Sequence, residues 1–237
     1  MFINYAHRGA SAYAPENTLM SFYLGIMQGA DGIETDIQRT KDGVLVLYHD
    51  MSLNRAFGIE GSIADYTFDE LQRLSVTNNG LCDKIPKFTD FLEHFGWRDL
   101  TFAIEVKVPG TTEEEIVKLI NQYHVNEKTI VTSQHFEAIK KVKEIDPALR
   151  VGLLVWNVQE DPIPKLQEIG AEQLCPFIDA ITPELVERVH GLGMEIRGWG
   201  ISDEEKMRRV YDLGTDGTTI NFPDKLEAYR RECGEQR

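Results

Sequence analysis

Short runs of apolar and β-branched residues recur along the second half of the chain and predict a regular series of strands. These runs begin near Thr101, Thr129, Arg150, Glu172, Met194 and Thr215. After the first gap, their starts are roughly 22 residues apart, which leaves room for one helix between successive strands. In the first half, Asn4 to His7 and Gly32 to Gln38 predict two more strands, making eight in all.

Amphipathic stretches between these runs predict helices. Apolar residues at helical spacing form stripes from Phe136 to Ile145, from Leu185 to Leu192 and from Leu19 to Ile26. Helix-start signals fall where this rhythm requires them, namely at Thr112 with Glu115, Ser202 with Glu205, and Thr182 with Pro183. Glycines that would end helices before the next strand are Gly170, Gly193 and Gly214.

The alternation of strands and helices predicts a parallel sheet, and eight such units indicate a (β/α)8 TIM barrel. A doubly wound open sheet is the alternative, which periodicity alone does not exclude. The segment 50–87 interrupts the rhythm with several Gly and Asn residues and one helix signal, Thr67 to Leu71. We interpret it as a small insertion after the second strand, at the catalytic face of one domain spanning residues 1–237. The polar end from Arg230 to Arg237 is predicted to fray.

The second predicted strand carries two carboxylates on one face. Because side chains alternate along a strand, Glu34 and Asp36 share one face, while Ile33, Thr35 and Ile37 share the other. In a barrel the apolar face packs against helices, so the two carboxylates point inward. Two ionised carboxylates on a buried face need a cation, and oxygen ligands of this kind suit Mg²⁺ or Ca²⁺.

The next predicted barrel strand repeats the pattern, because Glu105 and Lys107 share one face of the run from Phe102 to Val108. We expect Glu105 to be a third metal ligand and Lys107 to meet a phosphate oxygen. A solvated edge strand or a simple Glu–Lys ion pair would explain one such strand alone. Two adjacent barrel strands favour the metal site, since barrel strands are buried on both sides.

Histidines at the ends of extended runs are candidates for proton transfer. His7 closes the first strand and precedes Arg8, and His49 closes the run from Val44 to Tyr48. Barrel enzymes place catalytic residues at strand C-termini, so we interpret the two histidines as general acid and base. The planar guanidinium of Arg8 suits phosphate oxygens. Three other histidines are interpreted as structural, namely His94, His124 and His190.

The chain is acidic, with a formal net charge of -14, and lacks the basic footprint of general nucleic-acid binding. An anionic substrate would need local positive charge from a cation and a few Arg or Lys side chains. Three cysteines without a CxxC pair are predicted to be reduced thiols, namely Cys82, Cys175 and Cys233. No signal peptide is evident and no apolar run approaches a membrane span, so we expect a cytoplasmic protein.

A series of short segments follows one order along the chain: Ala6-His7-Arg8-Gly9, Pro15-Glu16-Asn17-Thr18, Gly32-Ile33-Glu34-Thr35-Asp36, Asp42-Gly43, Tyr48-His49-Asp50, Gly61-Ser62-Ile63-Ala64-Asp65 with Leu71, Ile85-Pro86, and Ile104-Glu105-Val106-Lys107. Together they resemble the signature of the glycerophosphodiester phosphodiesterase family. The resemblance covers nearly the whole chain and is most specific over residues 1–50.

The resemblance implies a TIM barrel with one divalent cation held by Glu34, Asp36 and Glu105. It implies that His7 and His49 are the acid–base pair of a phosphodiester hydrolase. In this family the substrate's own neighbouring hydroxyl can attack phosphorus, which gives a cyclic phosphate that is then opened. Which histidine is the base in which half-reaction stays open at this point.

The resemblance also implies phosphate contacts from Arg8 and Lys107. Glu16 and Asn17 take supporting places, and structural roles are preferred to direct catalytic ones for both. Glu16 would orient the loop that carries the first histidine, and Asn17 would cap the first helix.

Two departures from the family pattern leave substrate choice open. The usual Trp-Thr-Val-Asn at the seventh strand is Trp199-Gly200-Ile201-Ser202, and the usual Asp before Phe222-Pro223 is Asn221. Trp199 would pack on the carbons of the substrate, with a core role as the competing interpretation. Arg197 shares its strand face and would add positive charge inside the barrel.

The favoured reaction is hydrolysis of glycerophosphodiesters to glycerol 3-phosphate and an alcohol. One alternative is lysophospholipase D activity on lysophospholipids, but no amphipathic helix that would meet a membrane stands out. Others are a noncatalytic phosphodiester-binding barrel and a hydrolase that activates water on its metal. The sequence does not decide between Mg²⁺ and Ca²⁺, identify the alcohol, or settle whether the chain forms a homo-oligomer.

Overall fold

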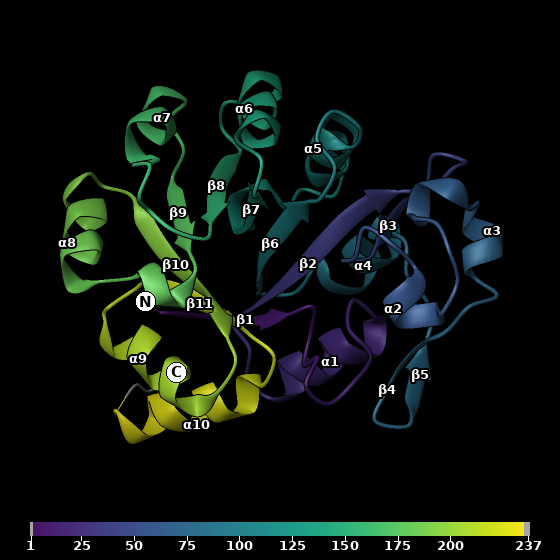
Figure 1. Ribbon diagram of the computed structural model, residues 1–237, viewed down its shortest axis with the longest axis horizontal. Coiled ribbons are helices and arrows are strands. Elements are labelled where there is room, and N and C mark those ends of the chain that lie inside the picture. Colours follow the sequence, from purple (N-terminus) through teal and green to yellow (C-terminus); the bar gives the residue numbers. More distant parts are fainter. Residues whose placement is uncertain (1, 235–237) are drawn as a thin grey trace.

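Eight parallel strands close on themselves, as the spacing of the apolar runs predicts. The computed structural model describes residues 2–234. Its barrel strands are β1 (Ile3–His7), β2 (Gly32–Arg39), β6 (Thr101–Val106), β7 (Thr129–Ser133), β8 (Arg150–Val155), β9 (Gln173–Pro176), β10 (Glu195–Ile201) and β11 (Gly217–Ile220). Each pairs in parallel with the next, and β1 pairs with both β2 and β11 (Figure 1). This closure confirms the TIM barrel and excludes the open doubly wound sheet.

Helices surround the barrel on its outer face (Figure 1). They are α1 (Leu19–Met27), α4 (Phe88–Phe95), α5 (Glu113–Gln122), α6 (Phe136–Ile145), α7 (Ile163–Glu168), α8 (Pro183–Gly191), α9 (Glu204–Asp212) and α10 (Pro223–Glu232). The main core lies between them and the strands. For example, Phe22 and Phe102 meet the ring of Phe91 edge to face, with centroids 5.3 and 5.2 Å away. No helix among the described residues is long and apolar enough to span a membrane.

The helix starts predicted at Thr182 and Thr112 are confirmed, although Thr112 lacks the predicted capping bonds, and the start predicted at Ser202 lies one residue further along. Thr182 caps α8, because its hydroxyl accepts from the backbone N–H of Leu185. The Thr112 side chain makes no capping bond; instead the carboxylate of Glu113 accepts from the backbone of Gly110. At α9 the cap is Asp203 rather than Ser202, and its carboxylate accepts from the backbone of Lys206. Neighbouring residues with oxygen-bearing side chains compete for these positions, so spacing alone does not choose between them.

The interruption after β2 is a small structure with its own core. The strand β3 (Leu45–Leu47) leads into it, and its own elements are α2 (Asn54–Phe57), a 3-10 turn (Ile63–Asp65), α3 (Phe68–Leu71), β4 (Val76–Asn78) and β5 (Leu81–Asp83). The buried residues that hold it together are Val46, Tyr48, Leu53, Ile63, Leu71, Val76 and Ile85. It lies beside the barrel beyond β2, on the right in Figure 1. We refer to residues 50–87 as the insertion.

Residues 230–232 do not fray, contrary to the prediction for the polar end of the chain. The last helix, α10, runs to Glu232, and Arg230 is buried on it. The Arg230 guanidinium forms ion pairs with Asp31 and Glu227. Burial of a paired charge explains why a polar segment is ordered here. Residues 235–237 lie outside the described part of the chain.

Candidate active site

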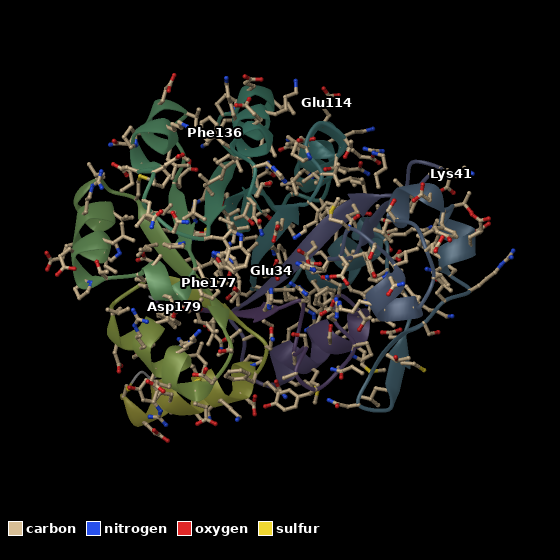
Figure 2. All side chains as sticks on the ribbon, viewed as in Figure 1. Glu34, Lys41, Glu114, Phe136, Phe177 and Asp179 are labelled. Carbon is tan, nitrogen blue, oxygen red and sulfur yellow. The ribbon has the colours of Figure 1, made fainter. Side chains whose placement is uncertain are left out.

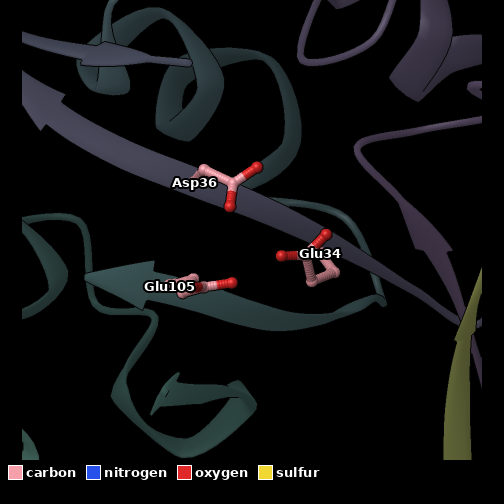
Figure 3. Close-up of side chains that lie close together, drawn as sticks. All are labelled: Glu34, Asp36 and Glu105. Carbon is pink, nitrogen blue, oxygen red and sulfur yellow. The ribbon is translucent and has the colours of Figure 1, made fainter. Parts of the chain in front are cut away.

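Three buried carboxylates converge inside the barrel, as side-chain alternation predicts. Glu34 and Asp36 lie two residues apart on β2, and the strand register sets Asp36 opposite Glu105 of β6. One oxygen from each carboxylate lies within 4.8 Å of the others, and the three side chains point toward one another (Figure 3). Figure 2 shows Glu34 inside the ring of strands, whereas Lys41 and Glu114 lie at the rim of the molecule. We call these three residues the acidic cluster.

The acidic cluster is short of positive charge. Burial, together with the charges of Asp36 and Glu105, raises the pKa of Glu34 well above its ordinary value. Burial and Asp36 likewise raise the pKa of Glu105 to about 7. Burial opposes ionisation of Asp36 too, but Lys107 and Arg8 outweigh it and lower the pKa of that carboxyl. The cluster therefore retains protons near neutral pH unless a cation joins it.

Two basic side chains lie directly on the cluster. Lys107 Nζ is 2.8 Å from Glu105 Oε1 and 3.4 Å from Asp36 Oδ1. Arg8 Nε is 3.3 Å from Asp36 Oδ2. Arg8 follows β1 in a left-handed conformation with φ of 57°, and its backbone N–H donates to a carboxylate oxygen of Glu34 at 3.1 Å. A non-glycine residue with this backbone is strained, and such strain concentrates at functional sites.

The two candidate catalytic histidines are held in the same way. His7 Nδ1 lies 2.6 Å from Asn221 Oδ1, and His49 Nδ1 lies 2.8 Å from Asp50 Oδ1. Because both partners are oxygens that accept hydrogen bonds, each neutral imidazole carries its proton on Nδ1. Nε2 of His7 faces Glu34 Oε2 at 3.8 Å. Burial and the neighbouring charge of Arg8 lower the pKa of His7, so its neutral form is favoured.

His49 does not follow a barrel strand, which corrects the sequence-based interpretation. Its extended run is β3, which pairs antiparallel with β2 outside the closed barrel. The long strand β2 continues past its pairing with β6, and β3 returns alongside it until Tyr48 bonds to the backbone of Asp36. This return brings His49 back to the acidic cluster. The apolar run predicted extended structure but carried no information on its direction.

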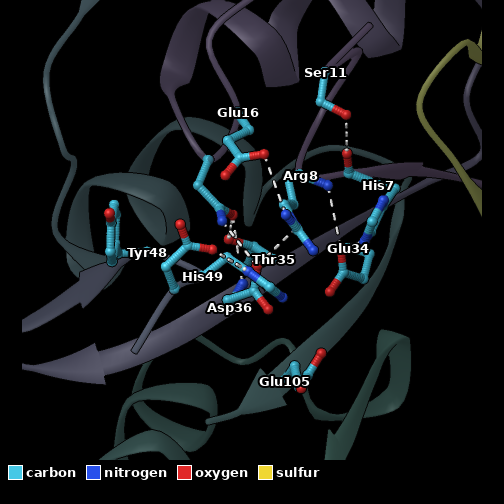
Figure 4. A network of polar contacts seen from close by, with 12 residues as sticks. His7, Arg8, Ser11, Glu16, Glu34, Thr35, Asp36, Tyr48, His49 and Glu105 are labelled. Carbon is cyan, nitrogen blue, oxygen red and sulfur yellow. Dashed lines mark hydrogen bonds and ion pairs between the residues drawn. The ribbon is translucent and has the colours of Figure 1, made fainter. Parts of the chain in front are cut away.

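Asn17 and Glu16 support the site from the loop after β1, and the predicted cap at Asn17 is wrong. Thr18 is the N-cap of α1. The Asn17 amide instead donates to Asp36 Oδ2 at 2.8 Å and accepts from the hydroxyl of Thr35 at 2.7 Å. Glu16 accepts from Arg8 at 3.1 Å (Figure 4).

Arg55 of the insertion completes this network, and the sequence had not singled it out. Its Nε lies 2.5 Å from Asp50 Oδ2, and another guanidinium nitrogen donates to Glu16. Each of these carboxylates in turn contacts a candidate functional side chain, His49 or Arg8. The contact depends on how the insertion folds back over the barrel, and no local spacing encodes it.

Two cavities open beside the acidic cluster. The smaller, of about 290 Å³, is lined by Arg197, Thr219 and Asn221 among others. The wider, of about 680 Å³, reaches the insertion at Met51 and the end of β8 at Trp156. Residues that line both cavities are Arg8, His49, Glu105, Gln134 and Trp199.

Arg197 and Trp199 point into the barrel from β10, as their shared strand face predicts. Arg197 is fully buried, donates to Gln173 Oε1 at 2.9 Å and packs over the ring of Tyr5. The Trp199 indole donates to the backbone oxygen of Cys175 at 2.9 Å while the ring lines both cavities. The ring is thus fixed at the site rather than buried in the outer core.

Two of the histidines interpreted as structural have partners away from the acidic cluster. His94 pairs with the Tyr23 hydroxyl at 2.9 Å, and His190 Nε2 lies 2.9 Å from Asp216 Oδ2. The three cysteines form no disulfide within the described residues.

Sequence comparison places this geometry in a family. The model of the glycerophosphoryl diester phosphodiesterase family matches residues 7–225. A glycerophosphodiester phosphodiesterase from Caldanaerobacter subterraneus subsp. tengcongensis is 34% identical, covering 97% of this chain and 98% of that protein. Another, from Bacillus altitudinis, is 31% identical and covers 96% and 98%. The chain belongs to the glycerophosphoryl diester phosphodiesterase family.

The fold of this family member also matches solved structures. A phosphodiesterase from Oleispira antarctica, solved in complex with its product sn-glycerol-3-phosphate, aligns with a TM-score of 0.84 at 23% identity. The alignment covers 95% of each chain. At this identity the match shows the shared fold.

Two local departures from the family pattern have visible structural consequences. Asn221, in place of the usual acid, gives His7 a neutral amide partner. At Ser202 the expected capping role passes to Asp203, so the start of α9 is preserved.

Proposed function

We propose that this family member hydrolyses glycerophosphodiesters to glycerol 3-phosphate and an alcohol, with one divalent cation held by Glu34, Asp36 and Glu105. The relatives that cover nearly the whole chain are named for this activity. The observation that carries the proposal is the acidic cluster itself, buried beside two basic side chains and two histidines whose Nδ1 atoms are held by hydrogen bonds.

The residues fit a hard divalent cation. Three carboxylates outnumber the two cations beside them by one charge, and a diester substrate adds a second negative charge. A single divalent ion balances both. In addition, the buried Asp36 Oδ1 accepts no hydrogen bond from the described residues. Carboxylate oxygens alone suit either Mg²⁺ or Ca²⁺. When bound, the cation would polarise the phosphoryl oxygens and stabilise the charge that develops on them.

The basic residues bind the phosphate, and the histidines transfer protons. Arg8 and Lys107 orient the diester by contacting its non-bridging oxygens. The unprotonated Nε2 of one histidine accepts the proton of the attacking neighbouring hydroxyl, whose oxygen bonds to phosphorus. The other histidine, which enters the step protonated on both nitrogens, donates its Nε2 proton to the departing alcohol oxygen as the bond from that oxygen to phosphorus breaks. Water then opens the cyclic phosphate with the two proton transfers reversed.

The partners of the two histidines suggest which one starts as base. His7 has a neutral amide on Nδ1 and a lowered pKa, so it enters the reaction unprotonated and suits the base. Asp50 Oδ1 lies 2.8 Å from Nδ1 of His49 and fixes its ring, which leaves His49 for the role of proton donor. We therefore assign His7 as base and His49 as acid in the first half-reaction.

The test is release of glycerol 3-phosphate from glycerophosphocholine by purified protein with Mg²⁺, with Ca²⁺ or with EDTA. We expect release with a divalent ion, none with EDTA, and a loss of at least about a thousandfold in kcat for His7→Ala and Glu34→Gln. Activity that survives EDTA and extensive dialysis would overturn the metal assignment. Failure to cleave any glycerophosphodiester, while the protein still binds one, would favour a noncatalytic binding barrel.

A further inference from the structure

The acidic cluster opens into two cavities, and a phosphodiester has two arms. Both cavities share Arg8, His49 and Glu105, the residues proposed above to surround the phosphate. A diester whose phosphorus lies at this junction would therefore extend one arm into each cavity. The two cavities differ in volume and in lining, and these differences indicate which arm each cavity would hold.

The smaller cavity suits the glycerol arm. Its volume is about 290 Å³, and Arg197, Ser202, Thr219 and Asn221 contribute polar groups to its lining. The buried guanidinium of Arg197 has one nitrogen, Nη1, without a hydrogen-bond partner among the described residues. A small polyol offers oxygens that satisfy such donors. The wider cavity, of about 680 Å³, is left for the alcohol arm.

The wider cavity presents large apolar side chains to solvent. Trp156 is 60% exposed and Met51 is 59% exposed, and they approach the cavity from β8 and from the insertion. Two exposed apolar side chains that line one cavity, on segments far apart in sequence, indicate a binding surface.

The Trp156 ring is held in place despite its exposure. It packs edge to face on Trp199, with centroids 4.5 Å apart, and lies 5.4 Å from the ring of Phe177. Phe177 in turn fits only because position 200 is glycine, since a Cβ there would lie 2.0 Å from the phenyl ring. Gly200 also has a φ of 81°, which favours glycine. A ring fixed before binding loses little entropy when a ligand packs on it.

The exposed face of the Trp156 ring suits a cation with an apolar surface. The charged groups that line the cavity do not decide the occupant, because Asp50 and Glu105 are balanced there by Arg8 and Lys107. Aromatic faces attract cations, and a quaternary ammonium loses less hydration on such a face than a primary ammonium does.

We propose that the wider cavity is the subsite for the departing alcohol and selects a quaternary ammonium alcohol, with Trp156 as the ring that contacts it. This inference depends on the proposed function for the identity of the reaction. It names the alcohol, which the family assignment leaves open.

The test compares kcat/KM for glycerophosphocholine and glycerophosphoethanolamine in the wild type, Trp156→Ala and Trp156→Phe. We expect the wild type to prefer the choline diester. Trp156→Ala should lower kcat/KM for that diester about tenfold, mainly by raising KM, and change the ethanolamine diester less than about twofold. Trp156→Phe should keep most of the preference. The matched control is Trp97→Ala, which removes another exposed tryptophan outside both cavities.

Three results would overturn the inference while leaving the proposed function intact: equal losses on both diesters, no loss on either, or no preference for choline in the wild type. Melting temperatures of all variants show whether a loss reflects unfolding. If the wild type cleaves neither diester, the proposed function fails. Calorimetric titration with free choline then tests the proposed subsite by itself. Choline binding that is weakened in Trp156→Ala would support the subsite, and absence of choline binding would refute it.

Discussion

Asp36 has no exposed surface, and its carboxylate is held from three directions. Asn17 Nδ2 donates to it at 2.8 Å, while Arg8 and Lys107 lie 3.3 and 3.4 Å away. The amide of Asn17 is the neutral member of this set and also fixes Thr35 on the opposite face of β2. Groups that orient a metal ligand in this way affect the metal without touching it.

Replacement of Asn17 tests this orienting role. We expect Asn17→Ala to weaken divalent-cation affinity by roughly ten- to a hundredfold, since Asp36 loses its only amide donor among the residues seen here. Isothermal titration with Mg²⁺ and Ca²⁺ would measure the change. The control, Asn121→Ala, removes an exposed amide of α5 and should leave affinity unchanged. Unchanged affinity in Asn17→Ala would show that the amide only shapes the loop.

Individual side chains differ in how far the sequence predicts them. The acidic cluster follows from alternation along two strands, because alternation and strand pairing are regular. The contact of Asn17 with Asp36 requires the loop after β1 to turn over β2, with Asn17 at a φ of 55°. Likewise, burial of Arg230 depends on Asp31, about 200 residues away along the chain. Such distant pairings leave no local pattern.

Among the elements, the insertion does more than cover one side of the barrel. Its short helix α2 carries Arg55, which pairs with Glu16 and Asp50 on two separate loops. These loops hold Arg8 and His49, so one guanidinium links the proposed phosphate ligand to the proposed acid. The position of the insertion is therefore coupled to the geometry of the site.

A substitution at Arg55 separates this coupling from general stability. Arg55→Gln should lower kcat/KM for glycerophosphocholine by about tenfold or more, because Asp50 and Glu16 lose a charged partner and their orientation. Arg55→Lys should restore only part of the activity, since a lysine does not bridge two carboxylates with a planar fork. The matched control is Arg73→Gln, at an exposed arginine of the same insertion. Equal losses of kcat/KM in Arg55→Gln and Arg73→Gln would mean that Arg55 contributes only to the surface charge of the insertion.

The elements themselves are largely predictable, and the errors have identifiable causes. All eight barrel strands begin within a few residues of their predicted starts, because buried parallel strands are continuous apolar runs. The apolar run that ends at His49 is equally clear, yet β3 lies outside the barrel because strand direction is a tertiary property. The capping boxes predicted at Thr112 and Ser202 fail for a different reason, since adjacent acidic residues form the bonds at these helix starts. Glu113 accepts from the backbone N–H of Thr112, and Asp203 accepts from that of Lys206.

For the whole molecule, the acidic cluster links stability to pH and to cations. The raised pKa values of Glu34 and Glu105 mean that protonation stabilises the metal-free fold in acid. The contribution of Glu105 is lost as pH rises through about 7, and that of Glu34 is lost as pH rises through its own raised pKa. The lowered pKa of His7 acts in the opposite sense, since its contribution is lost as pH falls below the ordinary histidine range. A cation competes with protons only at the carboxylates.

Thermal melting with and without a divalent cation separates the contribution of the carboxylates to pH-dependent stability from that of His7. We expect saturating Mg²⁺ or Ca²⁺ to raise the melting temperature by roughly 5 °C more at pH 8 than at pH 5.5. Glu34→Gln should abolish most of this difference. The same increase at both pH values would mean that the cation does not displace protons from the cluster.

The pairing of β1 with β11, which closes the barrel, affects the order in which parts of the site can form during synthesis. The three carboxylates of the acidic cluster lie on β2 and β6, which precede β11 along the chain. By contrast, β1 must wait for β11, and His7 must wait for Asn221, before the ring can close. A nascent chain arrested before β11 would thus have its carboxylates without the partner that fixes the tautomer of His7. We therefore expect the partner of the proposed base to be added later than the strands whose carboxylates are proposed to hold the cation.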